Sequence, residues 1–109
     1  MKFLAISRFN SAWNALAPEK QAAITLASFA YVEKYKKSGQ LKEVFLLGDL
    51  KSSATVWEHK SSEEMTRAVM EIPFFAYQDM EVLAPIVEED AYRKVFAEAM
   101  EAAQKAGSH

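Results

Sequence analysis

The sequence predicts an α+β domain of the ferredoxin-like, split βαβ type, followed by one extra helix at the C-terminus. Hydrophobic patterning orders the predicted elements as strand, helix, strand, strand, helix, strand and a last helix. A short turn joins the two middle strands, which is typical of an antiparallel hairpin. The chain has 109 residues, a length that suits one domain with one core. This βαββαβ order places the two inner helices on one face of an antiparallel sheet.

The first strand and the first helix are predicted from alternation and from helix signals. Residues 2–9 carry apolar side chains on both alternating faces, which favours a strand covered on both sides. Residues 10–17 form a polar connection, and Pro18 is a favoured first helical residue. The helix continues to about Lys37 and is closed by Gly39. Because its middle is apolar nearly all round, we expect one side on the sheet and the other against a second copy or the C-terminal helix.

The hairpin strands are predicted over residues 41–47 and 53–59. Regular alternation places Leu41, Glu43 and Phe45 on one face of the first of these strands. The short connection between them implies an antiparallel hairpin.

A second helix, which Ser61 or Ser62 caps, is followed by a proline and an aromatic turn that lead into the last strand. The helix ends at Pro73, because proline has no N–H to continue the helical bonds and keeps the preceding residue out of the α region. Residues 74–77 form the aromatic turn. The last strand is predicted over residues 80–87, where Pro85 favours a sheet edge or a bulge. Asp90 then caps a terminal helix whose apolar residues lie on one stripe, which requires a surface to dock on.

One face of the predicted sheet has no helix to cover it. The two inner helices occupy the other face, and the uncovered face is apolar too. We therefore expect a homodimer or a higher homo-oligomer in which two sheets close against each other into a barrel.

Composition argues against several classes of function. The formal net charge of −2 provides no basic surface for nucleic acid, and no apolar run is long enough to span a membrane. Without cysteine, and with one histidine inside the predicted domain, no metal site is expected, and three scattered glycines give no phosphate-binding loop. We expect a cytoplasmic protein that uses no cofactor. Residues 1–106 form the single domain, whereas residues 107–109 resemble the start of a purification tag.

A family resemblance appears at the end of the second helix. Residues 72–82, Ile-Pro-Phe-Phe-Ala-Tyr-Gln-Asp-Met-Glu-Val, resemble the Leu-Pro-Leu-Phe-Pro-Tyr-Met-Asp-Ile-Glu-Val signature of muconolactone isomerases. The likeness extends without gaps from Gly39 through Val82. These enzymes are small members of the dimeric α+β barrel superfamily that move a double bond in a lactone. The resemblance implies the same fold.

The resemblance also implies a class of reaction. It suggests a cofactor-independent isomerase or cyclase that transfers protons on a small apolar lactone, aromatic or polyketide-like metabolite. The chain departs from the family on its second strand, where Lys42, Glu43 and Phe45 stand in place of Arg, His and Trp. A cofactor-free monooxygenase is the alternative within the superfamily, and a non-catalytic ligand-binding or assembly module is the alternative outside the enzymes.

Three side chains are candidates for proton transfer. His59 belongs to a residue type that titrates near neutral pH, and its plainer interpretation is a structural strand-end histidine. Glu43 is a candidate base if its strand face lies inside, or else it is a solvated carboxylate at a wet rim. Tyr77 has a hydroxyl that suits a carbonyl or phenolate oxygen, or else it fills the core.

Aromatic side chains are the candidate walls of a substrate pocket. An apolar pocket needs such walls and a segment that closes over them, and the connection 10–17 is the candidate lid. A tryptophan in a strand is more often simply part of the core. The predicted substrate-binding residues are Trp13, Phe29, Phe45, Trp57 and Phe75.

Overall fold

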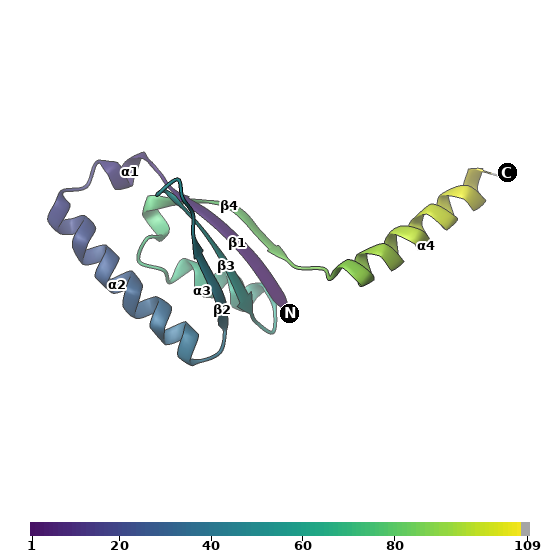
Figure 1. The fold of residues 1–109 in the computed structure, drawn as a ribbon, viewed down its shortest axis with the longest axis horizontal. Coiled ribbons are helices and arrows are strands. Elements are labelled where there is room, and N and C mark those ends of the chain that lie inside the picture. Colours follow the sequence, from purple (N-terminus) through teal and green to yellow (C-terminus); the bar gives the residue numbers. More distant parts are fainter. Residues whose placement is uncertain (108–109) are drawn as a thin grey trace.

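The computed structural model describes residues 1–107 and shows the predicted order of elements (Figure 1). Ser108 and His109, which belong to the predicted tag, lie outside the described residues. The elements are β1 (Lys2–Phe9), α1 (Ser11–Asn14), α2 (Pro18–Lys37), β2 (Leu41–Leu46), β3 (Ser52–Glu58), α3 (Ser62–Met70), the short 3-10 helix η1 (Phe75–Tyr77), β4 (Gln78–Pro85) and α4 (Glu89–Gly107).

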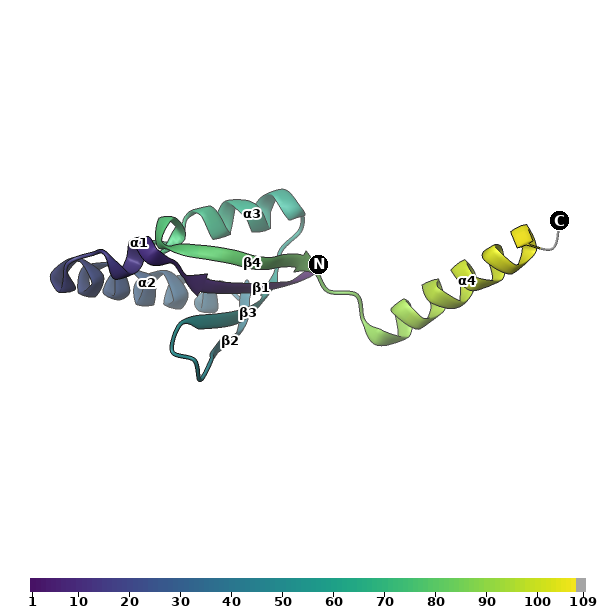
Figure 2. The ribbon, with the colours of Figure 1, turned by 90° about the horizontal axis from the view of Figure 1, so that it is seen from above.

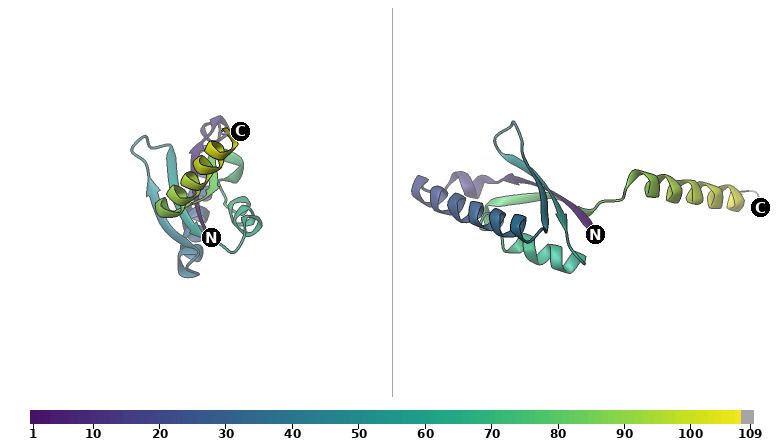
Figure 3. Two further views of the ribbon diagram at one scale, coloured as in Figure 1. Left: turned by 90° about the vertical axis from the view of Figure 1, so that its right-hand side faces the viewer. Right: turned by 60° about the horizontal axis from the view of Figure 1, so that its bottom comes forward.

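The sheet confirms the ferredoxin-like prediction. Its four strands lie in the order β2-β3-β1-β4, and each neighbouring pair is antiparallel. The helices α2 and α3 lie side by side on the same face of this sheet (Figure 3). Within residues 1–107, no helix covers the opposite face, as the sequence predicted. We call these the covered face and the open face.

The core lies between the covered face and the two helices. Its largest fully buried side chains are Phe3 from β1 and Met65 from α3. The remaining buried apolar residues come from α2, the strands and α3: Ala5, Tyr31, Tyr35, Leu41, Trp57, Ala68 and Val69. Since α2 contributes only Ser28, Tyr31 and Tyr35 as buried residues, one side of this predicted two-sided helix stays exposed.

An irregularity in β2 changes the predicted face of two residues. Leu41 pairs with Trp57, but the next register pair joins Glu43 to Val56, which leaves Lys42 as an extra residue. Leu41 therefore shares the covered face with Trp57, whereas Glu43 shares the open face with Val56. The prediction from regular alternation, which placed Leu41 and Glu43 on one face, is wrong because a bulge shifts the side-chain period by one residue.

The turn between β2 and β3 is closed by Asp49. Its Oδ1 accepts hydrogen bonds of 2.9 Å from the backbone N–H of both Lys51 and Ser52, and its Oδ2 accepts one of 2.6 Å from the Ser52 hydroxyl. These bonds, led by the one from the Ser52 hydroxyl, lower the pKa of Asp49 to about 2. Within this turn Leu50 has a positive φ of 62°, and the hydrogen bonds of Asp49 support this conformation.

The segment from α3 to β4 follows its predicted signals. The Ser61 hydroxyl accepts a hydrogen bond from the Glu64 N–H and caps α3. The helix ends before Pro73, and the aromatic turn forms η1. Pro85 is the last residue of β4, which is an edge strand of the sheet.

The helix α4 extends away from the rest of the molecule (Figure 2). It makes the protein elongated, with principal extents of 67 × 31 × 25 Å. None of its residues is buried. The apolar stripe predicted for this helix is present and exposed, with Tyr92 at 63% and Phe96 at 57% of their full exposure. The docking surface that the stripe requires is not provided by its own chain in this structure.

Candidate functional site

A small cavity lies between the covered face and the helices α2 and α3. Its volume is about 40 Å³, which is room for on the order of two or three water molecules. A ring-shaped metabolite needs more space, so its entry requires the helices to move away from the sheet. The lining residues come from all four strands, from both helices and from the turn after α3: Ala5, Ser7, Tyr31, Val32, Leu41, Ser53, Thr55, Trp57, Val69, Ile72, Gln78 and Met80.

Hydroxyl groups from two neighbouring strands meet at the cavity. Ser7 on β1 faces Ser53 on β3, and their Oγ atoms lie 3.1 Å apart in a hydrogen bond. Thr55 accepts a 2.7 Å hydrogen bond from the Trp57 indole N–H. This indole bond fixes the Trp57 ring that forms one wall, because a buried indole N–H needs a partner.

One amide group in the cavity has no partner. The Nε2 atom of Gln78, at the start of β4, is fully buried and makes no hydrogen bond. A buried donor without a partner costs on the order of 1–3 kcal/mol. A group kept at such a cost is a candidate for binding a ligand oxygen.

The register of β4 explains how Gln78 enters the site. Ile6 pairs with Val82 but Ser7 pairs with Met80, so the β1–β4 register shifts and Glu81 is the extra residue. The shift brings Met80 and Gln78, rather than Asp79 and Glu81, to the covered face. The cavity therefore receives an amide and a thioether while the two acids remain exposed.

Tyr31 lines the helix side of the cavity and packs against Tyr35, and the hydroxyls of both tyrosines are occupied. Tyr31 donates a hydrogen bond to the Ala68 carbonyl oxygen, and burial raises its pKa well above the usual range. Tyr35 donates a 2.7 Å hydrogen bond to Glu71 Oε2. Burial, followed by this bond, raises the pKa of Tyr35 to about 12. Both hydroxyls stay protonated near neutral pH and join α2 to α3.

His59 is buried directly beside one wall of the cavity. Its side chain is 1% exposed and stacks on Trp57, with ring centroids 5.7 Å apart. Its Nδ1 lies 3.4 Å from Glu64 Oε1 at a geometry too loose for a hydrogen bond, and its Nε2 has no partner. The imidazole next to it lowers the pKa of Glu64. A carboxylate on one side and an unpaired nitrogen on the other is the arrangement of a base with its orienting group.

Tyr77 and Trp13 lie in a separate aromatic cluster. Phe9 stacks on Trp13 with ring centroids 4.6 Å apart, and Phe74 packs edge-on against both. Tyr77 lies 6.3 Å from Trp13 at the edge of this group. The Asn10 side chain caps α1, which fixes the predicted lid as a short helix over the cluster.

The cluster and His59 lie at opposite ends of the sheet. Phe9 pairs with Gln78 at one end of β1, whereas Lys2 pairs with Glu58, next to His59, at the other end. At about 3.3 Å per residue, the two ends lie on the order of 20 Å apart. Within one chain, Tyr77 and His59 therefore do not act on the same small molecule.

The other predicted site residues also lie outside the cavity. Glu43 is exposed on the open face, together with Phe45, which is 51% exposed. Phe29 is 60% exposed on the outer side of α2, and Phe75 is 43% exposed in η1. Among the predicted walls, Trp57 alone lines the cavity.

Sequence reasoning missed the polar groups of the cavity. Ser7, Ser53 and Gln78 are neutral residue types that no catalytic motif singles out. The available signal was the alternation of β1, which puts Ser7 on the same face as Phe3 and Ala5. A serine inside an otherwise apolar strand face needs a polar partner, and that partner marks the site.

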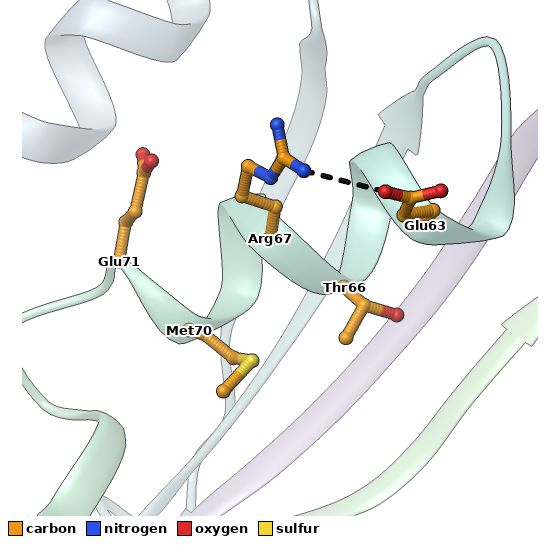
Figure 4. Close-up of a pocket in the computed structure, with 5 residues that line it drawn as sticks. All are labelled: Glu63, Thr66, Arg67, Met70 and Glu71. Atoms are coloured by element: carbon orange, nitrogen blue, oxygen red, sulfur yellow. Dashed lines mark hydrogen bonds and ion pairs between the residues drawn. The ribbon is translucent and has the colours of Figure 1, made fainter.

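A second hollow follows the outer surface of α3 (Figure 4). Its five lining residues recur at helical spacing along α3 and its C-cap residue: Glu63, Thr66, Arg67, Met70 and Glu71. Arg67 reaches back to Glu63 at 3.3 Å, which is an exposed ion pair of small energetic value. Since one helix face supplies the whole lining, this hollow has no opposing wall that would hold a ligand.

Within residues 1–107, no cluster of three or more His, Cys, Asp or Glu side chains is arranged to hold a metal ion. In the same range, no helix is both long and apolar enough to cross a membrane.

Comparison with known proteins identifies the fold. No family model and no curated protein matches the sequence. Among solved structures, the chain is similar to muconolactone isomerase, with a TM-score of 0.70 and 15% sequence identity over 82% of this chain and 91% of that chain. The chain thus has the fold of the isomerase that residues 72–82 resemble.

A second solved structure is similar over nearly the same length. It is the 5-chloro-2-hydroxyhydroquinone dehydrochlorinase of Burkholderia phenoliruptrix AC1100 in complex with 2,5-dihydroxybenzoquinone. The TM-score is 0.59, and the identity is 16% over 81% of this chain and 94% of that chain. At this level of identity both likenesses concern the fold.

Proposed function

We propose that the protein is a cofactor-independent enzyme that moves a proton on a small, apolar, carbonyl-bearing ring metabolite, such as a lactone or a quinone. The metabolite binds in the cavity between the covered face and the helices. Isomerisation or cyclisation is the proposed type of reaction.

The unpaired Gln78 amide carries this proposal. Proton removal next to a carbonyl builds negative charge on the carbonyl oxygen, and fixed hydrogen-bond donors in a dry site stabilise that charge. Gln78 Nε2 is buried without a partner, and the hydroxyls of Ser7 and Ser53 lie in the same lining. A set of neutral donors in an apolar wall suits an uncharged carbonyl compound that becomes an enolate.

The Glu64–His59 pair is the proposed source of the base. His59 Nε2 has no partner, and its ring stacks on Trp57, which is a wall of the cavity. The Trp57 ring separates the imidazole from the cavity, so proton transfer requires the entering ligand to break the indole bond to Thr55 and turn this ring aside. His59 is then the group that takes the proton, and Glu64 is a positioning residue.

A screen of the purified chain tests this function. Muconolactone and 2,5-dihydroxybenzoquinone absorb in the ultraviolet or visible range, so their turnover is followed by absorbance. We expect Gln78→Leu and His59→Gln each to lower kcat/KM by about 10²-fold or more. Tyr77→Phe is the matched control, since Tyr77 lies in the separate aromatic cluster, and its activity should remain. Loss of turnover in Tyr77→Phe together with full activity in Gln78→Leu would place the reaction in the cluster instead.

A ligand-binding module is the second candidate function. The lining of the cavity holds no carboxylate and no imidazole, so its direct contacts with a ligand are neutral. Under this alternative, ligands bind with unchanged absorbance spectra over time, and His59→Gln leaves the affinity unaltered. Calorimetry on the same compounds separates binding from turnover.

A further inference from the structure

We propose that Ser28 on α2 is a second ligand-binding residue of the cavity, and that the ligand carries a hydroxyl or a second carbonyl oxygen for this residue. The inference rests on the proposed function and extends it from the sheet to the helix wall. Gln78 then binds the ligand from β4, while Ser28 binds it from α2.

Ser28 has a buried hydroxyl without a hydrogen-bond partner. The residue is 3% exposed, and its Oγ atom makes no hydrogen bond within residues 1–107. Threonines inside α2 and α3 are paired along their own helices: Thr25 donates a 2.8 Å bond to the Gln21 carbonyl oxygen, and Thr66 donates one of 2.8 Å to that of Ser62. Ser28 does not make the equivalent bond, so its hydroxyl is available to a ligand.

The inner side of α2 is polar where a helix that covers a sheet is usually apolar. Gln21, Thr25 and Ser28 are half-buried or buried, whereas Leu26 and Phe29 are 68% and 60% exposed on the outer side. Burial of apolar surface alone would favour the reverse arrangement. Because Gln21 and Thr25 both take part in hydrogen bonds, Ser28 is the inner polar residue that a ligand can satisfy.

Ser28 lies in the middle of α2, between the two ends of the sheet. At the start of the helix, Gln21 Nε2 donates a 2.9 Å hydrogen bond to the Trp13 carbonyl oxygen in the aromatic cluster. Near its end, Tyr35 packs edge-on against Trp57, with ring centroids 5.4 Å apart. Ser28 is midway between Gln21 and Tyr35 in the sequence, which is about 10 Å from each at a rise of about 1.5 Å per residue.

Hydroxyl residues of the sheet lie at the same level. A step of about 10 Å from Trp57 along β3, towards the aromatic cluster, covers roughly three residues. It ends between Thr55 and Ser53, which both line the cavity. Ser53 is hydrogen-bonded to Ser7 there. Ser28 thus adds a helix wall to the hydroxyl groups that the two central strands provide.

The closed cavity stops one helical turn short of Ser28. Tyr31 and Val32 line the cavity, and they follow Ser28 by one turn on the same side of α2. Since about 40 Å³ is too small for a ring, an entering ligand must separate α2 from the sheet. This separation extends the cavity along the helix, and Ser28 is the next polar side chain in that direction.

Two unpaired groups on different walls select a ligand with two polar sites. Gln78 Nε2 donates a hydrogen bond and therefore suits a carbonyl oxygen. The Ser28 hydroxyl both donates and accepts, so it suits a hydroxyl or a second carbonyl oxygen. Because β1 lies between β3 and β4, the two side chains approach the ligand from different sides.

Two ketones that differ by one hydroxyl test this selection on the full chain. Cyclohexanone and 4-hydroxycyclohexanone are titrated separately, and binding is followed by NMR chemical shifts of the protein. We expect Ser28→Ala to weaken binding of the hydroxyketone about fivefold, as the loss of one neutral hydrogen bond predicts, and to leave cyclohexanone binding unchanged. Gln78→Leu should weaken both about tenfold. Thr25→Val is the matched control, because the Thr25 hydroxyl is already bonded to its own helix.

The outcomes separate this inference from the proposed function. If Ser28→Ala leaves both affinities unchanged, or lowers both equally, while Gln78→Leu weakens both, Ser28 has no part in selection and only this inference fails. If the unmodified protein binds neither ketone, the proposed site fails and the inference fails with it. The melting temperature of Ser28→Ala should stay the same or rise, because no hydrogen bond is lost and alanine favours the helix. A lower melting temperature would assign the hydroxyl a structural role.

Labelling of a single cysteine tests the position of Ser28 in a second way, since the chain has no cysteine of its own. Ser28→Cys is treated with methyl methanethiosulfonate at increasing urea concentrations. We expect labelling through local opening, at a rate that low urea leaves unchanged and that saturating 4-hydroxycyclohexanone slows at least about fivefold. Phe29→Cys, on the outer side of α2, should react without protection. Labelling of Ser28→Cys only through global unfolding, or a rate that the ketone leaves unchanged, overturns the proposal.

Discussion

The two faces of the central sheet carry different side-chain chemistry within the same strands. On β1, Phe3, Ala5 and Ser7 are buried on the covered face, whereas Leu4 and Ile6 lie half-buried on the open face. The covered face mixes aromatic rings with hydroxyls and an amide. The centre of the open face is aliphatic.

This difference supports different proposed roles for the two faces. A hydroxyl or an amide inside a core lowers stability unless it is paired, so such groups remain where they bind something. The open face has no such groups at its centre, and an aliphatic surface of this size is typical of an interface. We therefore propose that the covered face binds the ligand and that the open face is where two copies of the chain associate.

The largest expected effect is the loss of stability when the Trp57 ring is removed from the covered face. Trp57 is 3% exposed and contacts Tyr35 and His59. Trp57→Ala should lower the free energy of unfolding by about 3–5 kcal/mol, because a buried ring leaves a cavity that neighbours fill only in part. Urea denaturation followed by circular dichroism measures the change. The control is Phe45→Ala, which removes a half-exposed ring from the open face. An equal loss of unfolding free energy in both variants would contradict the difference between the faces.

A charge on the open face should separate the subunits without unfolding them. Ile6→Glu places a carboxylate in the middle of the proposed interface, where burial of an unpaired charge is unfavourable. We expect the dimer dissociation constant to rise at least about 10²-fold, measured by sedimentation, while the circular dichroism spectrum of the variant stays native. The control is Thr66→Glu, which places the same charge on the exposed surface of α3, on the other side of the sheet. A dimer that persists in Ile6→Glu would remove the open face from the interface.

The fold was predictable because its signals are local. Pro18, Ser61 and Pro73 each fix one helix boundary through backbone geometry or a single capping bond. The face of a strand was predictable only where alternation is regular. The bulge at Lys42 in β2 depends on pairing with β3, which a single strand does not encode, and it moved Glu43 to the open face.

The candidate site was less predictable for the same reason. The shift at Glu81 decides that Gln78 rather than an acid enters the cavity, and it arises from the match of two strands distant in sequence. The sequence predicted Trp13 as a pocket wall and Tyr77 as a hydrogen-bond donor, yet these two residues lie together in a separate aromatic cluster. Their position depends on how α1 and η1 pack together, and composition does not determine that packing.

A smaller effect is expected at Gln78, with opposite signs for stability and for binding. Gln78→Leu removes a buried donor without a partner. The free energy of unfolding should therefore stay the same or rise by about 1 kcal/mol, while affinity for a carbonyl ligand falls about tenfold or more. Thermal unfolding and calorimetry measure the two effects. Ser53→Ala, which leaves Ser7 without its partner, should instead lower stability, and a destabilised Gln78→Leu would argue for a structural role of the amide.

The smallest effect concerns the exposed turn that holds the β2–β3 hairpin. The Ser52 hydroxyl and two backbone N–H groups lower the pKa of Asp49 to about 2 in the folded protein. The pKa of an aspartate in the unfolded chain is about 3.9. Because the folded pKa is the lower one, the stabilisation is fully present above about pH 4 and is lost as the pH falls through about 2. The melting temperature of Asp49→Ala should lie below that of the unmodified protein at neutral pH, and the gap should close between about pH 4 and pH 2. Asp49→Asn keeps one acceptor oxygen but does not titrate, so its stability should lack this step. A gap between the unmodified protein and Asp49→Ala that stays constant down to pH 2 would show that the ionised carboxylate does not hold the turn.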